Sequence, residues 1–530
     1  MLAVAESAVL MGLTSQPVRV EVKAVRGIPA FELVGLAETA VRESRVRVKS
    51  ALAQVGVDIN EYRITVNLAP ADVKKSGCAF DLAIALGTLV AVEQLPQDAI
   101  DGILMLGELS LNGVVQPLRG MVAHLLGGRQ RGVTRAIVPA ANESEASLVD
   151  HIHVALAHDL RAVIDAFRGN HSLPRPKRPS VTSADSSPSL AHGDDLAEVR
   201  GQHAARRALE VAAAGAHNLL MIGPAGAGKT MLARRLPGIL PCLTREERLE
   251  VIAVHGIAGL ATEAISTLGR RPFRAPHHSV SDAALVGGGE SARPGEVSLA
   301  HRGVLFLDEL AEFRRPSLEA LRQPLEDGVV AVARMKGSAT FPAEPMLIAA
   351  TNPCPCGNRG DGTGRCACSP DAVRQYRRRL SGPLLDRIDV HVVLPPVGVL
   401  DLEETTRGES SAVVRERVER ARQRQLVRYQ SGLTSATTNA RLRQRDIEIV
   451  CQVDLASRAL LEVAVRKRGL SARGYGKVLR VARTIADLAG EEMIATAHVA
   501  EAVAGRVLDR DTGESNESVV RKPQGETHAR

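Results

Sequence analysis

A glycine-rich loop between a short apolar segment and a helix-like segment constrains the fold of this chain more than any other feature. Residues 218–222 are apolar after the first asparagine, and residues 223–230 continue as GPAGAGKT. A strand, loop and helix in this order place backbone N–H groups around phosphate oxygens, where the helix dipole favours negative charge. The sequence therefore predicts an α/β core that binds a nucleotide.

The loop also supplies two side chains for the bound nucleotide. Lys229 is expected to reach the β- and γ-phosphates, and the hydroxyl of Thr230 is expected to bind Mg²⁺. The predicted phosphate-binding residues are Gly223, Pro224, Ala225, Gly226, Ala227, Gly228, Lys229 and Thr230.

Two later segments supply the other groups that nucleotide hydrolysis needs. Residues 303–307 predict a buried strand that ends in two acids, with Asp308 expected at Mg²⁺ and Glu309 at the attacking water. Residues 346–351 predict a third buried strand, after which Asn352 is expected to position that water. Two acids after an apolar run are weak evidence for a nucleotide site by themselves. They become strong evidence because the glycine-rich loop lies upstream in the same chain.

The charge and the aromatic content limit the classes of partner. The chain has 530 residues, with 67 Lys and Arg against 60 Asp and Glu, seven Phe, four Tyr and no Trp. The net charge of +7 weakly favours contact with polyanions, whereas proteins that stack single-stranded bases need clustered rings. Because the rings are spread along the chain, we expect any nucleic acid to be held through its phosphates.

The sequence shows no targeting or membrane-spanning segment. The first cation is Arg19, so the N-terminus lacks the basic region of a secretory signal. The longest apolar run, near residues 82–92, is much shorter than the about 20 residues that span a bilayer. We therefore expect a cytoplasmic protein that does not contact a membrane.

Composition and periodicity divide the chain into a multidomain α/β protein. Residues 1–168 alternate strand-like and helix-like segments and predict one α/β domain, and residues 169–193 form a Pro- and Ser-rich linker. A second α/β unit is expected at 194–399. Residues 400–507 have a mostly helical pattern, and the polar residues 508–530 predict a disordered tail.

Four of the seven cysteines lie close together, as Cys354, Cys356, Cys366 and Cys368. Such clustering favours a metal site over a disulfide framework. In an extended backbone, residues two apart point to the same side. Pro353 and Pro355 favour an extended conformation for the residues before them. Each Cys-x-Cys pair is therefore expected to present two thiolates on one side. The prediction is an insertion at 354–368 that holds a structural Zn²⁺, with reduced cysteines free of metal as the alternative.

Five further stretches are distinctive: FELVGL at 31–36, AVRESR at 40–45, RAPHHS at 274–279, PGEVSLAH at 294–301 and TNPCPCG at 351–357. Together with the nucleotide motifs, they are similar to the YifB/ComM family, a magnesium-chelatase-like branch of the AAA+ ATPases. The resemblance covers nearly the whole chain up to about residue 507. It implies a P-loop AAA+ core, a C-terminal helical lid, and ATP and Mg²⁺ as cofactors.

The resemblance also implies roles for two arginines. Arg387 matches the arginine finger that completes the ATP site of a neighbouring subunit, which implies a homo-oligomeric ring, most simply a hexamer. Because Arg387 stands between two acids, a local ion pair is the alternative. Arg480 matches the sensor-2 arginine of the lid, and Arg473 is the competing candidate.

The span between Lys229 and Asp308 is long, and residues 255–300 resemble an insertion of this AAA+ branch that usually faces the central channel. His277 and His278 lie within it. Isolated histidines are more often structural than catalytic, so no chemistry is assigned to them.

The N-terminal domain resembles the Lon-type protease domain at residues 107–117 and 131–139, and the ChlI-type domain of magnesium chelatase. A Lon-type protease needs a serine nucleophile and a lysine that takes its proton. The region expected to carry the serine contains Ser76 and Cys78, but residues 121–123 contain no lysine. We therefore expect no protease activity, and a role in ring contacts or binding.

Three functions from different classes remain open. The whole-chain resemblance favours an ATP-driven motor on DNA that promotes branch migration of recombination intermediates during natural transformation. The arginines at 374–379 are expected to contact DNA phosphates or to form a solvated face. The stretch 407–445, with ten Arg against three Glu, favours contact with DNA phosphates. The alternatives are a magnesium-chelatase-type ATPase subunit and a protein unfoldase with an inactive Lon-like domain.

Overall fold

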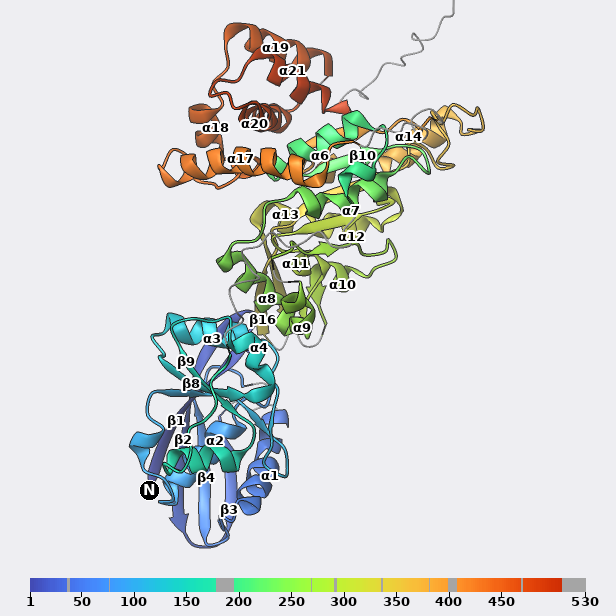
Figure 1. The fold of residues 1–530 in the computed structure, drawn as a ribbon. Coiled ribbons are helices and arrows are strands. Elements are labelled where there is room, and N and C mark those ends of the chain that lie inside the picture. Colours follow the sequence, from blue (N-terminus) through green and yellow to red (C-terminus); the bar gives the residue numbers. More distant parts are fainter. Residues whose placement is uncertain are drawn as a thin grey trace, which may run out of the picture.

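The computed structural model describes residues 1–35, 39–75, 77–177, 195–267, 269–289, 293–334, 337–380, 382–398, 408–468 and 470–507. Most of the predicted linker and the whole predicted tail lie outside these residues. The molecule is elongated, with an N-terminal α/β unit, a second α/β unit and a group of helices following one another along its length (Figure 1). Among the described residues, no helix combines the length and apolar character that crossing a membrane requires.

The N-terminal unit is built on a seven-stranded mixed sheet with the order β3-β4-β2-β1-β5-β8-β9. The predicted alternation of β2 is confirmed, because Val18, Val20 and Val22 are buried while Arg19 and Lys23 are exposed. The strands are β1 (Leu2–Met11), β2 (Thr14–Arg26), β3 (Ala30–Val34), β4 (Tyr62–Ala69), β5 (Ile103–Met105), β8 (Arg135–Pro139) and β9 (His153–Ala157).

The helices of this unit cover the sheet. Helix α2 (Asp81–Ala91) is buried along its whole length and packs on β1 and β2, as its apolar composition predicts. The other elements are α1 (Thr39–Gln54), α3 (Met121–Gln130), α4 (Glu143–Ala146), α5 (Leu160–Phe167) and the hairpin of β6 (Glu108–Leu109) and β7 (Val115–Gln116).

The second unit contains a five-stranded parallel sheet with the order β11-β14-β17-β10-β18. Its central strands are short and fully buried apolar runs, which is typical of a sheet covered on both faces. The strands are β10 (Leu219–Ile222), β11 (Phe273–Arg274), β14 (Val304–Leu307), β17 (Met346–Thr351) and β18 (Val390–Val393).

Helices and two hairpins surround this sheet. The helices are α6 (His203–Gly215), α7 (Lys229–Ile239), α8 (Arg245–Ala258), α9 (Ala261–Ser266), α10 (Asp282–Val286), α11 (Glu296–Leu299), α12 (Arg315–Ala320), α13 (Arg322–Asp327), α14 (Pro370–Arg378) and α15 (Gly382–Leu385). The hairpins are β12 (Gly287–Gly288) with β13 (Arg293–Pro294), and β15 (Val329–Arg334) with β16 (Gly337–Pro342).

The C-terminal region is helical, as its sequence pattern predicts. The helices are α17 (Ser411–Gln430), α18 (Gln444–Val450), α19 (Leu455–Arg468), α20 (Ala472–Ala489) and α21 (Thr496–Ala504). Helices α17 and α20 pack on α6, and their buried residues belong to the same hydrophobic cluster as the strands of the parallel sheet. The helical region therefore shares one core with the second α/β unit.

The two α/β units meet where α3 packs against α8. Met121 and Leu125 of α3 lie in one buried cluster with Leu249 and Ile252 of α8. Beside them Gly256 allows the backbones to come close, since a Cβ added there would lie 3.4 Å from the Cα of Gly120. This contact is apolar and continuous with the core of the N-terminal unit.

Candidate nucleotide site and cysteine cluster

The groups predicted for nucleotide binding lie at the carboxyl ends of three adjacent strands. β10 leads into the glycine-rich loop, its neighbour β17 ends before Asn352, and β14, on the other side of β17, ends before Asp308. The carboxyl edge of a parallel sheet is the usual ligand site of such folds. Three segments far apart in the sequence therefore meet at one place.

The side chains of these segments are in direct contact. Thr230 Oγ1 donates a hydrogen bond to Asp308 Oδ2 at 2.6 Å. Lys229 Nζ donates to the carbonyl of Gly223 at 2.7 Å, to that of Pro224 at 2.9 Å and to Asn352 Oδ1 at 3.1 Å. Burial lowers the pKa of Lys229, while the negative charges of Asp308 and of its neighbouring glutamate oppose that shift.

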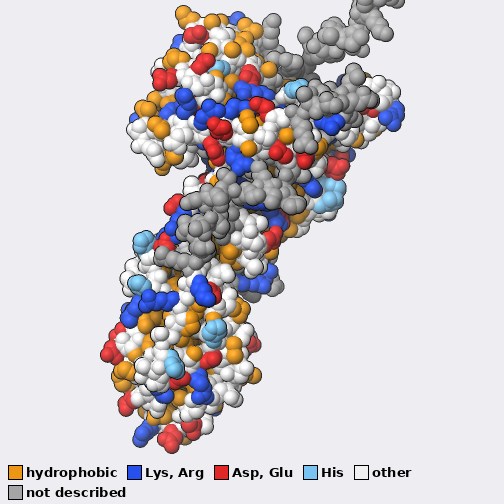
Figure 2. All heavy atoms as spheres, viewed as in Figure 1, with side chains coloured by type: hydrophobic (Ala, Val, Ile, Leu, Met, Phe, Trp, Pro, Cys, Tyr) orange, Lys and Arg blue, Asp and Glu red, His pale blue; other side chains and the backbone are white. Residues whose placement is uncertain are grey.

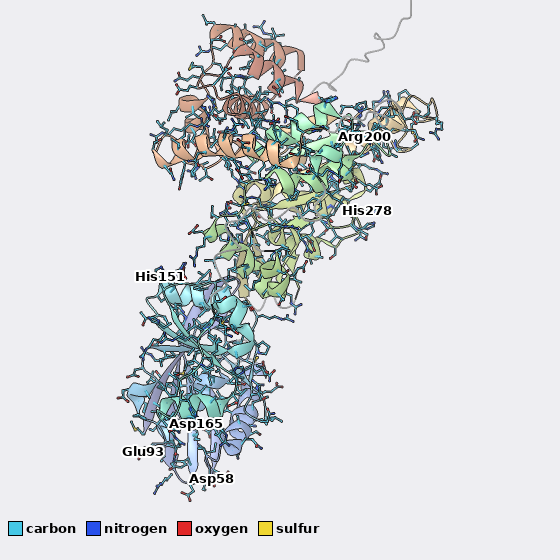
Figure 3. The ribbon with its side chains drawn as sticks, viewed as in Figure 1. Asp58, Glu93, His151, Asp165, Arg200 and His278 are labelled. Carbon is cyan, nitrogen blue, oxygen red and sulfur yellow. The ribbon has the colours of Figure 1, made fainter. Side chains whose placement is uncertain are left out.

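Glu309 has an unusual backbone and a basic neighbour. Its φ is 52°, a left-handed conformation that is uncommon outside glycine, and its side chain is 52% exposed. His278 Nδ1 lies 3.4 Å from Glu309 Oε2, and Figure 3 places His278 at the edge of the molecule. Sequence reasoning gave His278 no chemical role. The only sequence feature that could have pointed to this residue is its position in the distinctive RAPHHS stretch.

One boundary expected from the sequence is wrong. Residues 255–300 were expected to form an insertion, but within them β11 pairs in parallel with β14 as the edge strand of the central sheet. A two-residue strand leaves too short an apolar run for periodicity to show it. His277 and His278 follow this strand, which brings them to the same edge of the sheet as Glu309.

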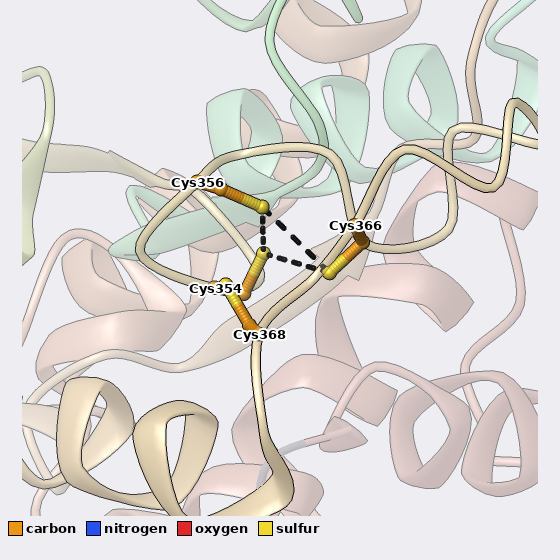
Figure 4. Close-up of side chains that lie close together, drawn as sticks. All are labelled: Cys354, Cys356, Cys366 and Cys368. Atoms are coloured by element: carbon orange, nitrogen blue, oxygen red, sulfur yellow. Dashed lines mark hydrogen bonds between the residues drawn. The ribbon is translucent and has the colours of Figure 1, made fainter.

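The four clustered cysteines come together, with their sulfur atoms all within 4.8 Å of one another. Dashed lines in Figure 4 mark three of the sulfur pairs. Their sulfur atoms lie 3.4 Å apart in Cys354 and Cys356, 3.7 Å apart in Cys354 and Cys366, and 3.7 Å apart in Cys356 and Cys366. A disulfide needs about 2.05 Å, so these cysteines are thiols. A hydrogen bond from the N–H of Asn358 and the neighbouring thiols lower the pKa of Cys356 to about 7.

The expectation that residues 354–356 are extended is wrong. The N–H of Gly357 donates to the carbonyl of Cys354 at 3.0 Å, which closes a turn with Pro355 in its second position. Proline is favoured at that position because its fixed φ suits the turn. The turn, rather than a strand, directs the first two thiols to one side.

Two of the three arginines singled out by the sequence, Arg387 and Arg480, contact their own chain. Arg387 forms an ion pair with Glu326 and donates to the carbonyl of Pro383 at 2.7 Å. Arg480, in the middle of α20, donates to the carbonyl of Leu442 at 2.9 Å, whereas Arg473 is exposed near the start of that helix. The finger and sensor roles stay predictions.

The Arg-rich stretch 407–445 is divided between internal and exposed side chains. Four of its arginines bond to residues of their own chain: Arg415, Arg417, Arg422 and Arg428. Five others are exposed: Arg420, Arg424, Arg441, Arg443 and Arg445. Figure 2 shows Lys and Arg side chains gathered on the visible face where α17 meets the C-terminal helices.

Comparison with known proteins shows similarity along nearly the whole chain. The chain is 41% identical over 512 residues to YifB of Escherichia coli (strain K12), covering 96% of this chain and 98% of that protein. It is 42% identical over 510 residues to the competence protein ComM of Haemophilus influenzae, with 96% and 98% covered. The chain belongs to the YifB/ComM family of magnesium-chelatase-like AAA+ ATPases.

Three family descriptions match successive parts of this YifB/ComM family member. Residues 20–142 match the family described as "Subunit ChlI of Mg-chelatase", and residues 195–402 match "Magnesium chelatase, subunit ChlI". Residues 408–506 match "Magnesium chelatase, subunit ChlI C-terminal". The family implies ATP and Mg²⁺ as cofactors.

The chain also has a second, more distant similarity that covers only part of it. It is 26% identical over 153 residues to Lon protease 2 of Bacillus subtilis, covering 28% of this chain and 27% of that protein. Ser76 lies outside the described residues. The thiol of Cys78 donates a hydrogen bond to Glu108. Burial is the main cause that raises the pKa of Cys78 to about 12, and the carboxylate of Glu108 is the second. That environment disfavours the thiolate that a nucleophile requires.

Proposed function

We propose that this chain is an ATP-hydrolysing AAA+ motor that acts on DNA as a homo-oligomeric ring, most simply a hexamer. The observation that carries the proposal is the contact of Thr230 with Asp308 and of Lys229 with Asn352 at one edge of the parallel sheet. Mg²⁺ would lie at Thr230 and Asp308, and Glu309 would orient the attacking water. Arg387 would act on the neighbouring subunit's ATP, and Arg480 or Arg473 would act from the lid.

DNA as the substrate is supported by similarity and by charge. A full-length relative carries the name competence protein ComM, and this resemblance is the reason to propose branch migration of recombination intermediates. The arginines of residues 374–379 are exposed on or just after α14, and five more are exposed at 420–445. Arginine contacts to phosphates are independent of sequence and sensitive to salt.

The decisive experiment compares three activators of ATP hydrolysis: a four-way DNA junction, a linear duplex of the same length, and an unfolded protein. We expect the junction to stimulate hydrolysis most, the stimulation to fall as salt rises, and Lys229→Ala to abolish it. Stimulation by unfolded protein alone would favour an unfoldase. No stimulation by any DNA, with intact basal hydrolysis, would contradict the DNA motor and leave the magnesium-chelatase-type subunit.

We also propose that the four cysteines hold a structural Zn²⁺. At a Zn–S distance of about 2.3 Å, tetrahedral geometry separates two sulfur atoms by about 3.8 Å. The three sulfur–sulfur distances of 3.4, 3.7 and 3.7 Å are close to that value. All four positions would be filled by protein, which leaves the metal without a catalytic water.

The domain boundaries proposed for this motor follow the sequence. Residues 1–168 form the Lon-like and ChlI-like domain, and the predicted linker at 169–193 lies mostly outside the described residues. Residues 194–399 form the AAA+ core with its insertion at 354–368. Residues 400–507 form the helical lid, and residues 508–530, predicted as a tail, lie outside the described residues. The N-terminal domain would serve ring contacts or binding rather than proteolysis.

A further inference from the structure

The cysteine cluster lies directly against the phosphate-binding loop. The N–H of Ala225, in that loop, donates a hydrogen bond to the carbonyl of Gly357 at 3.3 Å. Gly357 follows Cys356 and closes the turn that begins at Cys354. The backbone that carries two of the four thiols therefore also holds the backbone of the nucleotide site.

Gly357 also lies against the polar residue that contacts Lys229. A Cβ added at Gly357 would lie 3.8 Å from the Cβ of Ala225 and 3.8 Å from both Cγ and Nδ2 of Asn352. Asn352 Oδ1 in turn accepts the hydrogen bond from Lys229 Nζ. Gly357 thus joins the cluster, the glycine-rich loop and the lysine expected to reach the phosphates.

The loop between the two cysteine pairs forms hydrogen bonds mainly within itself, between Asp361 and Thr363 and between Thr363 and Arg365. Gly360, Gly362 and Gly364 have positive φ values of 80°, 76° and 70°, and each faces open space. Glycine backbone in such conformations is ordered only at a high entropic cost, so the loop needs a constraint from elsewhere. Four thiolates on one metal ion would provide that constraint.

We propose that metal binding by the four cysteines fixes Gly357 and thereby holds the phosphate-binding loop in its nucleotide-binding conformation. The inference rests on the proposed Zn²⁺ and ATP sites and gives the metal a second role beyond stabilising the fold. Loss of the metal frees the 354–368 loop, removes the support of Ala225 and Asn352, and weakens nucleotide affinity. Pre-organised loops bind more tightly because less entropy is lost on binding.

The first test measures the affinity for a fluorescent ADP analogue in the full-length protein with and without Zn²⁺. Zn²⁺ is removed with a chelator that is then dialysed away, and bound zinc is counted by mass spectrometry. We expect one Zn²⁺ per chain and at least about fivefold weaker ADP binding without it, the factor that one neutral hydrogen bond represents. Cys366→Ser should reproduce this loss, whereas Cys242→Ser, at an exposed cysteine outside the cluster, should not.

A matched pair of glycine variants tests the path from the cysteine cluster through Gly357 to the phosphate-binding loop, independently of metal binding. Gly357→Ala and Gly362→Ala impose the same backbone strain, since the φ values are 78° and 76°, but only the backbone at Gly357 carries the carbonyl that accepts the hydrogen bond from Ala225. We expect both variants to keep Zn²⁺ and the far-ultraviolet circular dichroism of the wild type, and only Gly357→Ala to weaken ADP binding. Equal ADP affinities for the two variants would contradict the path.

The other outcomes separate this inference from the proposed function. A chain that binds Zn²⁺ and holds ADP equally well after its removal has a purely stabilising metal, which overturns the inference and leaves the ATPase proposal intact. A chain that takes up no Zn²⁺ also overturns it. Absence of ADP binding by the metal-loaded protein would instead contradict the proposed nucleotide site.

Discussion

At the residue scale, Glu309 combines an uncommon backbone conformation with an exposed carboxylate. The residue directly follows Asp308 in a left-handed conformation, its side chain is half exposed, and His278 lies 3.4 Å away. A strained conformation at such a point fits a role in positioning. Replacing Glu309 with its neutral isostere, glutamine, is therefore the most direct single-residue test of this role.

We expect Glu309→Gln to lower the rate of ATP hydrolysis by about 100-fold or more, the usual contribution of a general base. Nucleotide affinity should change little, because Lys229 and the loop amides remain. Steady-state hydrolysis and ADP-analogue titration measure the two effects. Glu312→Gln is the control: this exposed acid lies three residues further on and pairs with Arg379 at 3.3 Å. A similar loss in both variants would contradict the assignment.

His124 makes stability depend on pH. It is buried in α3, its Nδ1 has no hydrogen-bond partner among the described residues, and burial lowers its pKa to about 4. Between pH 6.5 and 4 the unfolded chain takes up a proton that the folded chain refuses. The free energy of unfolding therefore falls as the pH falls through this window, by about 2 kcal/mol at pH 5.

The measurement is the unfolding midpoint of the wild type and of His124→Gln at pH 7 and pH 5. The variant cannot take up a proton there, so its difference between the two pH values should be smaller. His153→Gln, at an exposed histidine of β9, should keep the wild-type difference. An unchanged pH dependence in His124→Gln would show that the side chain titrates normally.

At the element scale, one buried carboxylate ties α17 to α20. Asp487 Oδ2 accepts from Arg428 at 2.5 Å and from Asn439 at 2.8 Å, and Asp487 Oδ1 accepts from Arg428 at 2.8 Å. Arg483 lies 3.1 Å from the same carboxylate. Asp487 is almost fully buried, so its negative charge is what makes two arginines tolerable in the core.

We expect Asp487→Ala to destabilise the helical region by about 3–5 kcal/mol, because removal of one partner leaves buried charges uncompensated. Limited proteolysis should then cut within α17–α21 before the α/β units are cut. Glu462→Ala, which breaks an exposed pair with Arg466 at 3.8 Å, is the control and should not change the pattern. Equal resistance of both variants would contradict the role of Asp487.

At the scale of the whole molecule, the proposed ring requires Arg387 to change partners. In the chain by itself its guanidinium pairs with Glu326 and is mostly buried. An arginine that serves a neighbour's ATP must leave this pairing when subunits assemble. The change can be tested without knowing the ring's geometry.

We expect Lys229→Ala and Arg387→Ala each to abolish hydrolysis, and an equal mixture of the two to recover about one quarter of the wild-type rate. If Arg387 acts in trans, random mixing leaves about one quarter of the sites with an intact lysine and an intact neighbouring arginine. Mixing must be done under conditions that allow subunit exchange, checked with labelled chains. No recovery despite exchange would place Arg387 in its own subunit's site.

Much of the nucleotide site was predictable because its parts are local. The GPAGAGKT loop, the acids after 303–307 and the asparagine after 346–351 each follow a buried strand, and short apolar runs with fixed end residues are visible in one dimension. The cluster of cysteines was visible for the same reason. His278 and β11 were not, because a two-residue edge strand leaves no periodic signal.

The sequence by itself determined the identity of the phosphate-binding loop, the order of α/β and helical regions and the presence of four clustered thiols. Tertiary structure decided that β17 lies between β10 and β14, which puts Asn352 beside Lys229, and that the turn at 354–357 returns to Ala225. The strand order and the contact between the turn at 354–357 and Ala225 both depend on segments more than 100 residues apart in the sequence. Such contacts follow from packing, which local propensity does not encode.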